Sequence, residues 1–387
     1  MELNQPIPFY ARFALILLML CLVVFILYIG NSVIMPLILA MLFAILLRPL
    51  VAFLNKRLHF PHVIAVLIAV ITFVIFVGSV IWFISWHVSD FMDDLPKIRH
   101  NLDIHIGHIK AWITHKFNIS PLKMERYIQS AAQDSLKSGN QLVGDTIASF
   151  SETFLTVVLI PIYTFLILLY RTLFIKFLHK LVHKNYHSNM VDIVLKIKEV
   201  IQNYIVGLLI EMGIVAVLTS TGFMLIGVPY AILLGVIGAV LNLVPYIGSL
   251  CAGLIAIIAA LINSSELSSV IGVVVVNITV QLIDNNFLVP RIVASKVKIN
   301  ALVSIVAVFI GGMLAGVIGM FLAIPVVAIL KVIFDRVDDL RPWGYLMGAE
   351  LPKTYEWRKL RLPDLNAGME ESKEEEATHN KNIEKKE

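Results

Sequence analysis

The sequence predicts an all-α, polytopic helical membrane protein with about six full spans and two broken or re-entrant helical hairpins in an inverted repeat. Hydrophobic residues make up 58% of the 387 and charged residues only 15%, against about 45–50% and 25% in soluble chains. Apolar runs of about 20 residues, long enough to cross a bilayer as helices, recur along the chain. A β-barrel would instead show alternating segments of about ten residues.

Residues 1–86 are expected to form an N-terminal three-helix membrane segment. The runs 13–29 and 33–47 are separated by a short Gly-Asn-Ser segment, as in a tight helical hairpin, and 63–86 makes a third span. The first run is too long for the core of a signal peptide and is not followed by a small-residue cleavage site. We therefore expect it to remain in the membrane.

Residues 87–146 differ in character, with mixed charges, five histidines and amphipathic spacing, and predict an extracytoplasmic helical region. Residues 147–340 form the predicted transport core, in which 171–200 is a basic cytoplasmic loop. The positive-inside rule places this loop and the basic end of the first segment in the cytoplasm, together with both termini. Residues 341–387 are predicted to be a cytoplasmic tail, partly disordered because its end consists mainly of Glu and Lys.

The second half of the chain repeats one pattern. A span at 201–226 precedes a long apolar stretch broken near 242–248, and a span at 270–289 precedes the stretch 301–334, which is broken by glycines. Neither stretch has room for two ordinary spans, and basic residues flank both ends of the second. This favours two hairpins of opposite polarity, as in transporters whose interrupted helices meet near the midplane.

Two acidic side chains lie inside predicted spans, Glu211 and Asp284. A charge near the bilayer centre costs at least about 2.5–3.5 kcal/mol, so each needs a partner, a proton or water. On a helix, Asn277, Gln281 and Asp284 share one stripe, which can line a polar pathway or coordinate a cation. The alternative is structural, since polar side chains also join membrane helices by hydrogen bonds.

Other candidates for the substrate or ion pathway surround these acids. The breaks are marked by Asn242, Pro245 and Gly248 in the first stretch and by Gly311 and Gly312 in the second, where close packing is the stronger interpretation. Beside Asp284 lie Asn285, Asn286 and Arg291. Arg291 either neutralises Asp284 or marks the cytoplasmic boundary, and Pro290 places Asp284 closer than Glu211 to that boundary.

Enzyme and cofactor signatures are missing from the sequence. There is no HExxH, Walker A loop, GxSxG or glycine-rich dinucleotide motif, so we expect no enzymatic activity, cofactor or ATP-driven pump. Of the five histidines from His87 to His115, only His105 and His108 are closely spaced, and no acidic partner lies at matching spacing, so we expect no metal site. The basic residues lie beside apolar runs rather than in one stripe, which argues against nucleic-acid binding.

Several motifs resemble the autoinducer-2 exporter family of bacterial membrane proteins, also described as PerM-type permeases. They are the strings 227–231 (GVPYA), 242–248 (NLVPYIG) and 281–286 (QLIDNN), followed by the glycines and the Ala-Ile-Pro ending of 311–325. One departure is the string 204–208, YIVGL, where the family often has a basic residue and a glutamine. The resemblance implies secondary export of small molecules from the bacterial inner membrane by a homo-oligomer.

The sequence therefore predicts a secondary transporter that exports a small polar solute, similar to autoinducer-2, or a cation, driven by a proton or sodium gradient. The partners expected are this solute or a monovalent cation, the lipid bilayer and further copies of the chain. A sodium or lithium/proton antiporter, a passive channel lined by the polar stripe, and a membrane scaffold protein remain alternatives.

Overall fold

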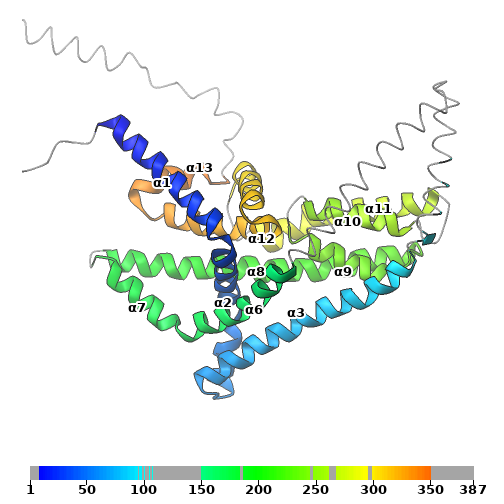
Figure 1. Ribbon diagram of the computed structural model, residues 1–387, viewed down its shortest axis with the longest axis horizontal. Coiled ribbons are helices and arrows are strands. Elements are labelled where there is room, and N and C mark those ends of the chain that lie inside the picture. The colour runs from blue at the N-terminus through cyan, green and yellow to red at the C-terminus, as the bar shows by residue number, and fades with distance from the viewer. Residues whose placement is uncertain are drawn as a thin grey trace, which may run out of the picture. The chain divides into compact units, whose positions relative to one another are not determined.

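The computed structural model describes residues 8–94, 96–97, 100, 104, 107, 150–183, 186–244, 247–260, 267–294 and 299–349. Helices account for nearly all of these residues, which confirms the all-α class. Among them, five helices are long and apolar enough to cross a membrane, or six if one bent pair counts as a single span. The polytopic membrane architecture is thus confirmed (Figure 1).

The N-terminal segment consists of three helices, α1 (Phe9–Ile29), α2 (Asn31–Arg57) and α3 (His62–Asp93). Helix α6 (Phe150–Leu169) packs against α2 and α3 through a core that includes Val66 and Leu168. Helix α7 (Arg171–Leu181) leaves α6 at an angle of 66°. Most of the predicted region 87–146 lies outside the described residues.

The predicted core contains α8 (His187–Leu225), α9 (Ala231–Leu241), α10 (Ile247–Ala260), α11 (Leu267–Ile283), the π-helix η2 (Asp284–Ala294) and α12 (Ala301–Phe334). After it come the short η3 (Asp338–Leu340) and α13 (Arg341–Leu346). We call the antiparallel pair α9 and α10 hairpin 1. The pattern of a span followed by a broken stretch therefore occurs twice, as the sequence predicts.

Helix α12 is also a hairpin, which we call hairpin 2. Ala315 and Gly316 leave helical geometry, and Gly316 has a φ of 56°, a conformation that glycine adopts at little cost. Beyond this break, Gly319 comes into backbone contact with Gly311. In a straight helix these residues would be about 12 Å apart along the axis, so the chain reverses between them.

Hairpin 1 follows the C-terminal end of α8, whereas hairpin 2 ends near the N-terminal end of α8. At the start of hairpin 1, the Tyr230 hydroxyl donates to Asp94 Oδ2 at 2.8 Å, just past the end of α3. At the start of hairpin 2, the backbone amide of Asn300 donates to the carbonyl of Met347, just past α13, at 3.0 Å. Arg336, just after hairpin 2, pairs with Asp192 near the start of α8.

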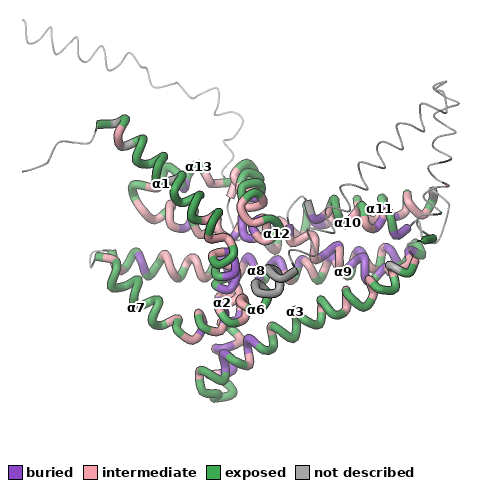
Figure 2. The backbone as a smooth tube through the Cα atoms, in the orientation of Figure 1, coloured by how far each residue is buried: buried purple, intermediate pink, exposed green. Residues whose placement is uncertain are grey.

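The breaks of both hairpins reach the middle of α8. Leu243 from hairpin 1 and Ala315 from hairpin 2 pack against the same core cluster, which includes Tyr204 and Leu208 of α8. Figure 2 shows buried positions concentrated along α2, α8 and α9, whereas α1 and α7 are exposed along their length. The interior of the protein is therefore built around α8.

Candidate functional site

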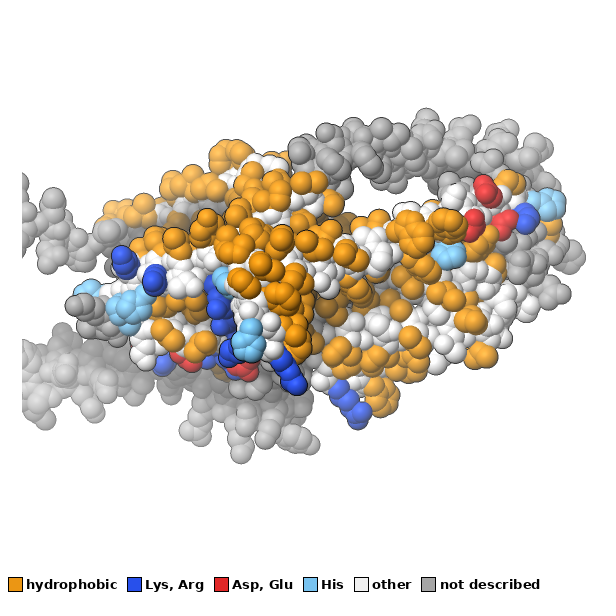
Figure 3. All heavy atoms as spheres, turned by 90° about the horizontal axis from the view of Figure 1, so that it is seen from below, with side chains coloured by type: hydrophobic (Ala, Val, Ile, Leu, Met, Phe, Trp, Pro, Cys, Tyr) orange, Lys and Arg blue, Asp and Glu red, His pale blue; other side chains and the backbone are white. Residues whose placement is uncertain are grey.

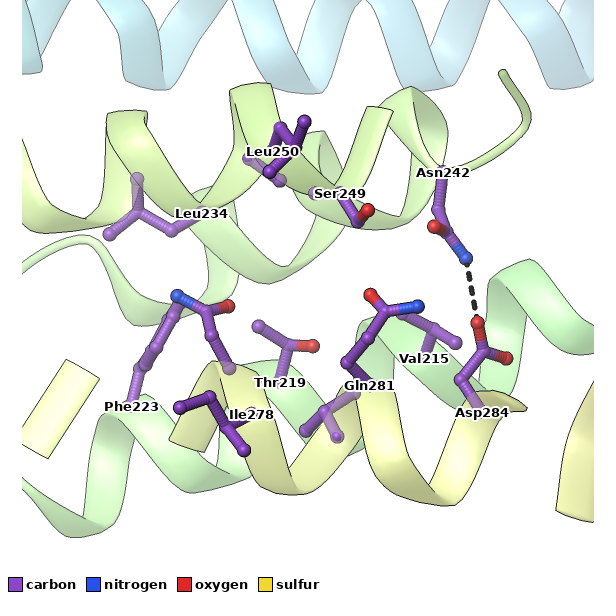
Figure 4. Close-up of a pocket in the computed structure, with 14 residues that line it drawn as sticks. Val215, Thr219, Phe223, Leu234, Asn242, Ser249, Leu250, Ile278, Gln281 and Asp284 are labelled. Carbon is purple, nitrogen blue, oxygen red and sulfur yellow. Dashed lines mark hydrogen bonds between the residues drawn. The ribbon is translucent and has the colours of Figure 1, made fainter. Parts of the chain in front are cut away.

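The polar centre of the protein is formed by three side chains from three elements. Asn242 follows the last residue of α9, Glu211 lies on α8, and Asp284 is the first residue of η2. The Asn242 amide donates to Glu211 Oε1 at 3.4 Å. It also donates to Asp284 Oδ2 at 3.2 Å, the bond drawn in Figure 4. Both carboxyl groups are nearly inaccessible, with 5% of Glu211 and 3% of Asp284 exposed. We call these residues the acid–amide cluster.

The helical repeat explains why Glu211 faces the interior. Leu208, Glu211, Val215, Thr219 and Phe223 are buried on α8 at intervals of three or four residues, which places them on one face. Glu211 is therefore held on the same face as its apolar neighbours. Its burial follows from the packing of the whole helix.

Asn242 is positioned by the tight reversal of hairpin 1. Its own backbone amide donates to the Gly238 carbonyl at 2.9 Å, and the Gly248 amide donates to the Val244 carbonyl at 3.0 Å. Gly248 lies in contact with the Leu241 carbonyl, so close that a Cβ atom would not fit. Glycine is thus required for α10 to start directly beside the end of α9, which leaves the Asn242 side chain directed toward the acids.

A cavity of about 210 Å³ adjoins the acid–amide cluster. Figure 4 shows that hairpin 1 forms one wall, while α8, α11 and the start of η2 form the other. Polar residues at the cavity are Thr219, Asn242, Ser249, Asn277, Gln281 and Asp284, and apolar residues include Phe223, Leu234, Leu250 and Ile278. This mixture is typical of a site for a small ligand, in which a few polar groups on an apolar lining set orientation.

Three buried polar atoms at the cluster and the cavity have no hydrogen-bond partner among the described residues. They are Glu211 Oε2, Asp284 Oδ1 and Asn277 Nδ2. Buried polar groups are nearly always paired, and leaving one unpaired costs about 1–3 kcal/mol. The arrangement therefore has two acceptors and one donor available for a proton, a cation, water or a polar solute.

The structure corrects the expected depth of Asp284. The helix does not end at Pro290, because α11 continues as the π-helix η2 to Ala294. The wider turns of a π-helix leave room for a proline ring, which in an α-helix clashes with the carbonyl four residues earlier. Asp284 consequently lies at the same level as Glu211, since the Asn242 amide contacts both.

The remaining predicted residues divide into three groups. Asn277 and Gln281 line the cavity with Asp284, and Gln281 donates to Asn285 at 3.1 Å. Asn286 is exposed and donates to the Leu282 carbonyl of its own helix, and the exposed Arg291 lies 5.8 Å above the Phe287 ring. Gly311 and Gly312 hold the two arms of hairpin 2 together, while Pro245 lies outside the described residues.

Sequence reasoning misses two polar residues of the cavity. Thr219 lies two helical turns after Glu211 on the same face of α8, so its position relative to the acid is a usable signal. Ser249 follows Gly248 on α10 and also lines the cavity. Only the tight turn of hairpin 1 brings it there, and no spacing in the sequence indicates that turn geometry.

Two broken hairpins reach the middle of α8, and a polar cavity lies between hairpin 1 and α8, α11 and the start of η2. These features are typical of membrane transport proteins of the interrupted-helix class. Among the described residues, no group of three His, Cys, Asp or Glu side chains is placed to hold a metal ion. The sequence profile described as AI-2E family transporter matches residues 15–339, and the chain belongs to this family.

Two relatives illustrate the similarity. "Putative transport protein YrrI" of Bacillus subtilis is 25% identical over 80% of this chain and 88% of its own length. "Putative transport protein YhhT" of Escherichia coli K12 is 22% identical over 84% of this chain and 90% of its own length. The matches extend over most of each protein, so the resemblance seen in the sequence motifs is confirmed as family membership.

Proposed function

We propose that this membrane transport protein is a secondary exporter of a small polar solute or a monovalent cation, coupled to protons carried by Glu211 and Asp284. The observation that carries the proposal is the acid–amide cluster beside the cavity. The two carboxyl groups lie side by side, because the Asn242 amide donates to both of them, and a shared proton would let them hydrogen-bond to each other. A hydrogen bond between two carboxyl groups requires a proton on one of them.

The cluster therefore has two chemically distinct states. With a proton between the carboxyl groups, the pair carries one negative charge that the Asn242 amide stabilises. Without it, two negative charges lie side by side in a poorly hydrated site and require a cation or a strongly polar ligand. Competition between a proton and the transported species at one site is the simplest basis for exchange.

The hairpins approach the middle of α8 from its two ends. Hairpin 1 begins beside Asp94, hairpin 2 ends near Asp192, and both pack against the middle of α8. In transporters of this class, access alternates as such elements move around a central site. Export rather than uptake, a homo-oligomeric state and the bacterial inner membrane as location follow the sequence prediction and remain part of the proposal.

Flux measurements in proteoliposomes test the coupling. The wild-type protein should move a candidate solute or sodium ions only under an imposed proton gradient, and Glu211→Gln and Asp284→Asn should abolish the dependence on that gradient. Glu199→Gln is the matched control, since Glu199 is exposed and pairs with Lys196 at 3.0 Å. Gradient-dependent flux that survives in both acid variants would refute proton coupling, and single-channel currents in planar bilayers would indicate a passive channel.

Cysteine labelling tests the orientation, in a background lacking Cys21 and Cys251. Leu302 and Tyr345 flank hairpin 2, are exposed to 72% and 79% and should both react from the cytoplasmic side when replaced by cysteine. Asp90, near the end of α3, should react only from the opposite side when replaced. Labelling of all three positions from one side of the membrane would contradict the prediction that the two hairpins start from opposite sides.

A further inference from the structure

Three basic side chains meet where α2, α6 and α8 pack together. Arg48 lies on α2, Arg171 is the first residue of α7, just past the end of α6, and Lys198 lies on α8, close enough for their positive charges to repel one another. All three are partly buried. Among the described residues, none of them forms an ion pair or a hydrogen bond. We call them the basic cluster.

Three other basic residues at this end of the protein form ion pairs with acidic side chains. Lys196 pairs with Glu199 at 3.0 Å, Lys331 pairs with Asp335 at 2.7 Å, and Arg336 pairs with Asp192. Within the described part of the chain, Glu199, Asp335 and Asp192 are thus already paired with cations outside the basic cluster. Figure 3 shows Lys and Arg side chains gathered over one half of the face, with few acidic groups among them.

Helix α7 lies next to the basic cluster and has the composition of a helix at a membrane surface. None of its residues is buried, and Leu173, Phe174, Phe177, Leu178 and Leu181 form an exposed apolar stripe. Thr172, Lys176 and Lys180 lie on the other side. A helix of this kind rests in the plane of the interface, with its apolar face in the acyl chains and its basic face among the headgroups.

We propose that Arg48, Arg171 and Lys198 bind the phosphate group of an anionic phospholipid headgroup. Because Arg171 is the first residue of α7, the interfacial position of α7 places the basic cluster at headgroup level. Guanidinium groups bind phosphate oxygens in pairs and an ammonium group adds a point charge. Basic pockets between membrane helices bind such headgroups, and the apolar stripe of α7 offers a surface for the acyl chains.

Lipid binding by the purified protein tests the assignment, measured by native mass spectrometry and by thermal stabilisation in detergent. The probes are phosphatidylglycerol, phosphatidylcholine and inorganic phosphate. Phosphatidylglycerol should bind the wild-type protein, and the triple variant R48Q/R171Q/K198Q should bind it about 100-fold more weakly. The control K196Q/R336Q/R341Q removes the same charge from residues that are already paired and should bind within about threefold of the wild type.

Comparison of the three probes shows whether the bound phosphate group belongs to a lipid headgroup or to a soluble anion. Stabilisation by phosphatidylglycerol but not by inorganic phosphate identifies a lipid site, whereas equal protection by inorganic phosphate supports the same chemistry with a soluble anion. Should the triple variant fail to fold, Arg171→Gln and Lys198→Gln alone should each weaken binding about fivefold. Unchanged binding in the cluster variants, equal loss in the control, or equal binding of phosphatidylcholine would overturn the proposal.

Discussion

Replacing Gly207 by alanine tests the packing that sets the distance between the two acids. Gly207 lies one turn before Glu211 on α8 and faces η2, where an added Cβ would lie 2.8 Å from the Ile292 carbonyl oxygen. Real Cβ atoms essentially never come so close to a backbone oxygen, so α8 and η2 must separate by about 0.5 Å. Since η2 begins at Asp284, the separation also stretches the 3.2 Å bond from Asn242 to Asp284.

The expected cost follows from two opposing effects. Overpacking against rigid backbone costs about 1–3 kcal/mol, and exchanging glycine for alanine inside a helix returns about 0.5–1 kcal/mol. Gly207→Ala should therefore lower the free energy of unfolding by about 1–2 kcal/mol. Gly213→Ala is the matched control on the same helix, because a Cβ there meets nothing within 4 Å, and it should be neutral or slightly stabilising.

Thermal unfolding in detergent, at one scan rate for both variants, should place the midpoint of Gly207→Ala a few degrees below that of Gly213→Ala. Flux in proteoliposomes should fall for Gly207→Ala, since a small misplacement in a polar site costs much of its activity, and stay unchanged for Gly213→Ala. Equal stability and equal flux in the two variants would refute the idea that close packing of α8 on η2 sets the site.

Two further predictions concern hydrogen bonds made by hairpin 1. Asn242→Ala should lower the free energy of unfolding by about 1.5–3 kcal/mol and abolish coupled flux, whereas Asn286→Ala removes only a bond within its own exposed helix and should do neither. Lys97 and the Tyr230 hydroxyl hold the pKa of Asp94 below its usual range, so their stabilisation is complete above about pH 4 and is lost as the pH falls through the lowered pKa. Tyr230→Phe should therefore reduce the loss of thermal stability on acidification below about pH 4, and an unchanged pH profile would count against the contact.

The sequence predicts the hairpins well because length and charge both bear on them. The stretch 301–334 is too short for two ordinary spans, and basic residues at both ends favour a reversal over one long span. The structure supplies that reversal at Ala315 and Gly316. The outcome for the predicted site residues is more mixed: Glu211, Asn242 and Asp284 come together, whereas Asn286 and Arg291 are exposed.

Two features of the site depend on geometry that hydropathy does not encode. The sequence pattern treats Pro290 as the end of a span, but the π-helical turns of η2 carry the helix past it and bring Asp284 level with Glu211. Ser249 reaches the cavity only because Gly248 allows α10 to start against the end of α9. Both depend on backbone conformations that a periodicity of 3.6 residues cannot represent.

The acid–amide cluster links the chemistry of the site to the movement of a hairpin. Glu211 and Asp284 belong to α8 and η2, which pack directly on each other at Gly207 and Ile292. Asn242 belongs to hairpin 1, so its two hydrogen bonds are the polar contacts that tie this hairpin to the acids. Movement of hairpin 1 away from α8 removes the amide that stabilises negative charge and opens the cavity at the same time. We infer that proton release and closure of hairpin 1 favour each other, since the amide donates most strongly to an ionised carboxylate.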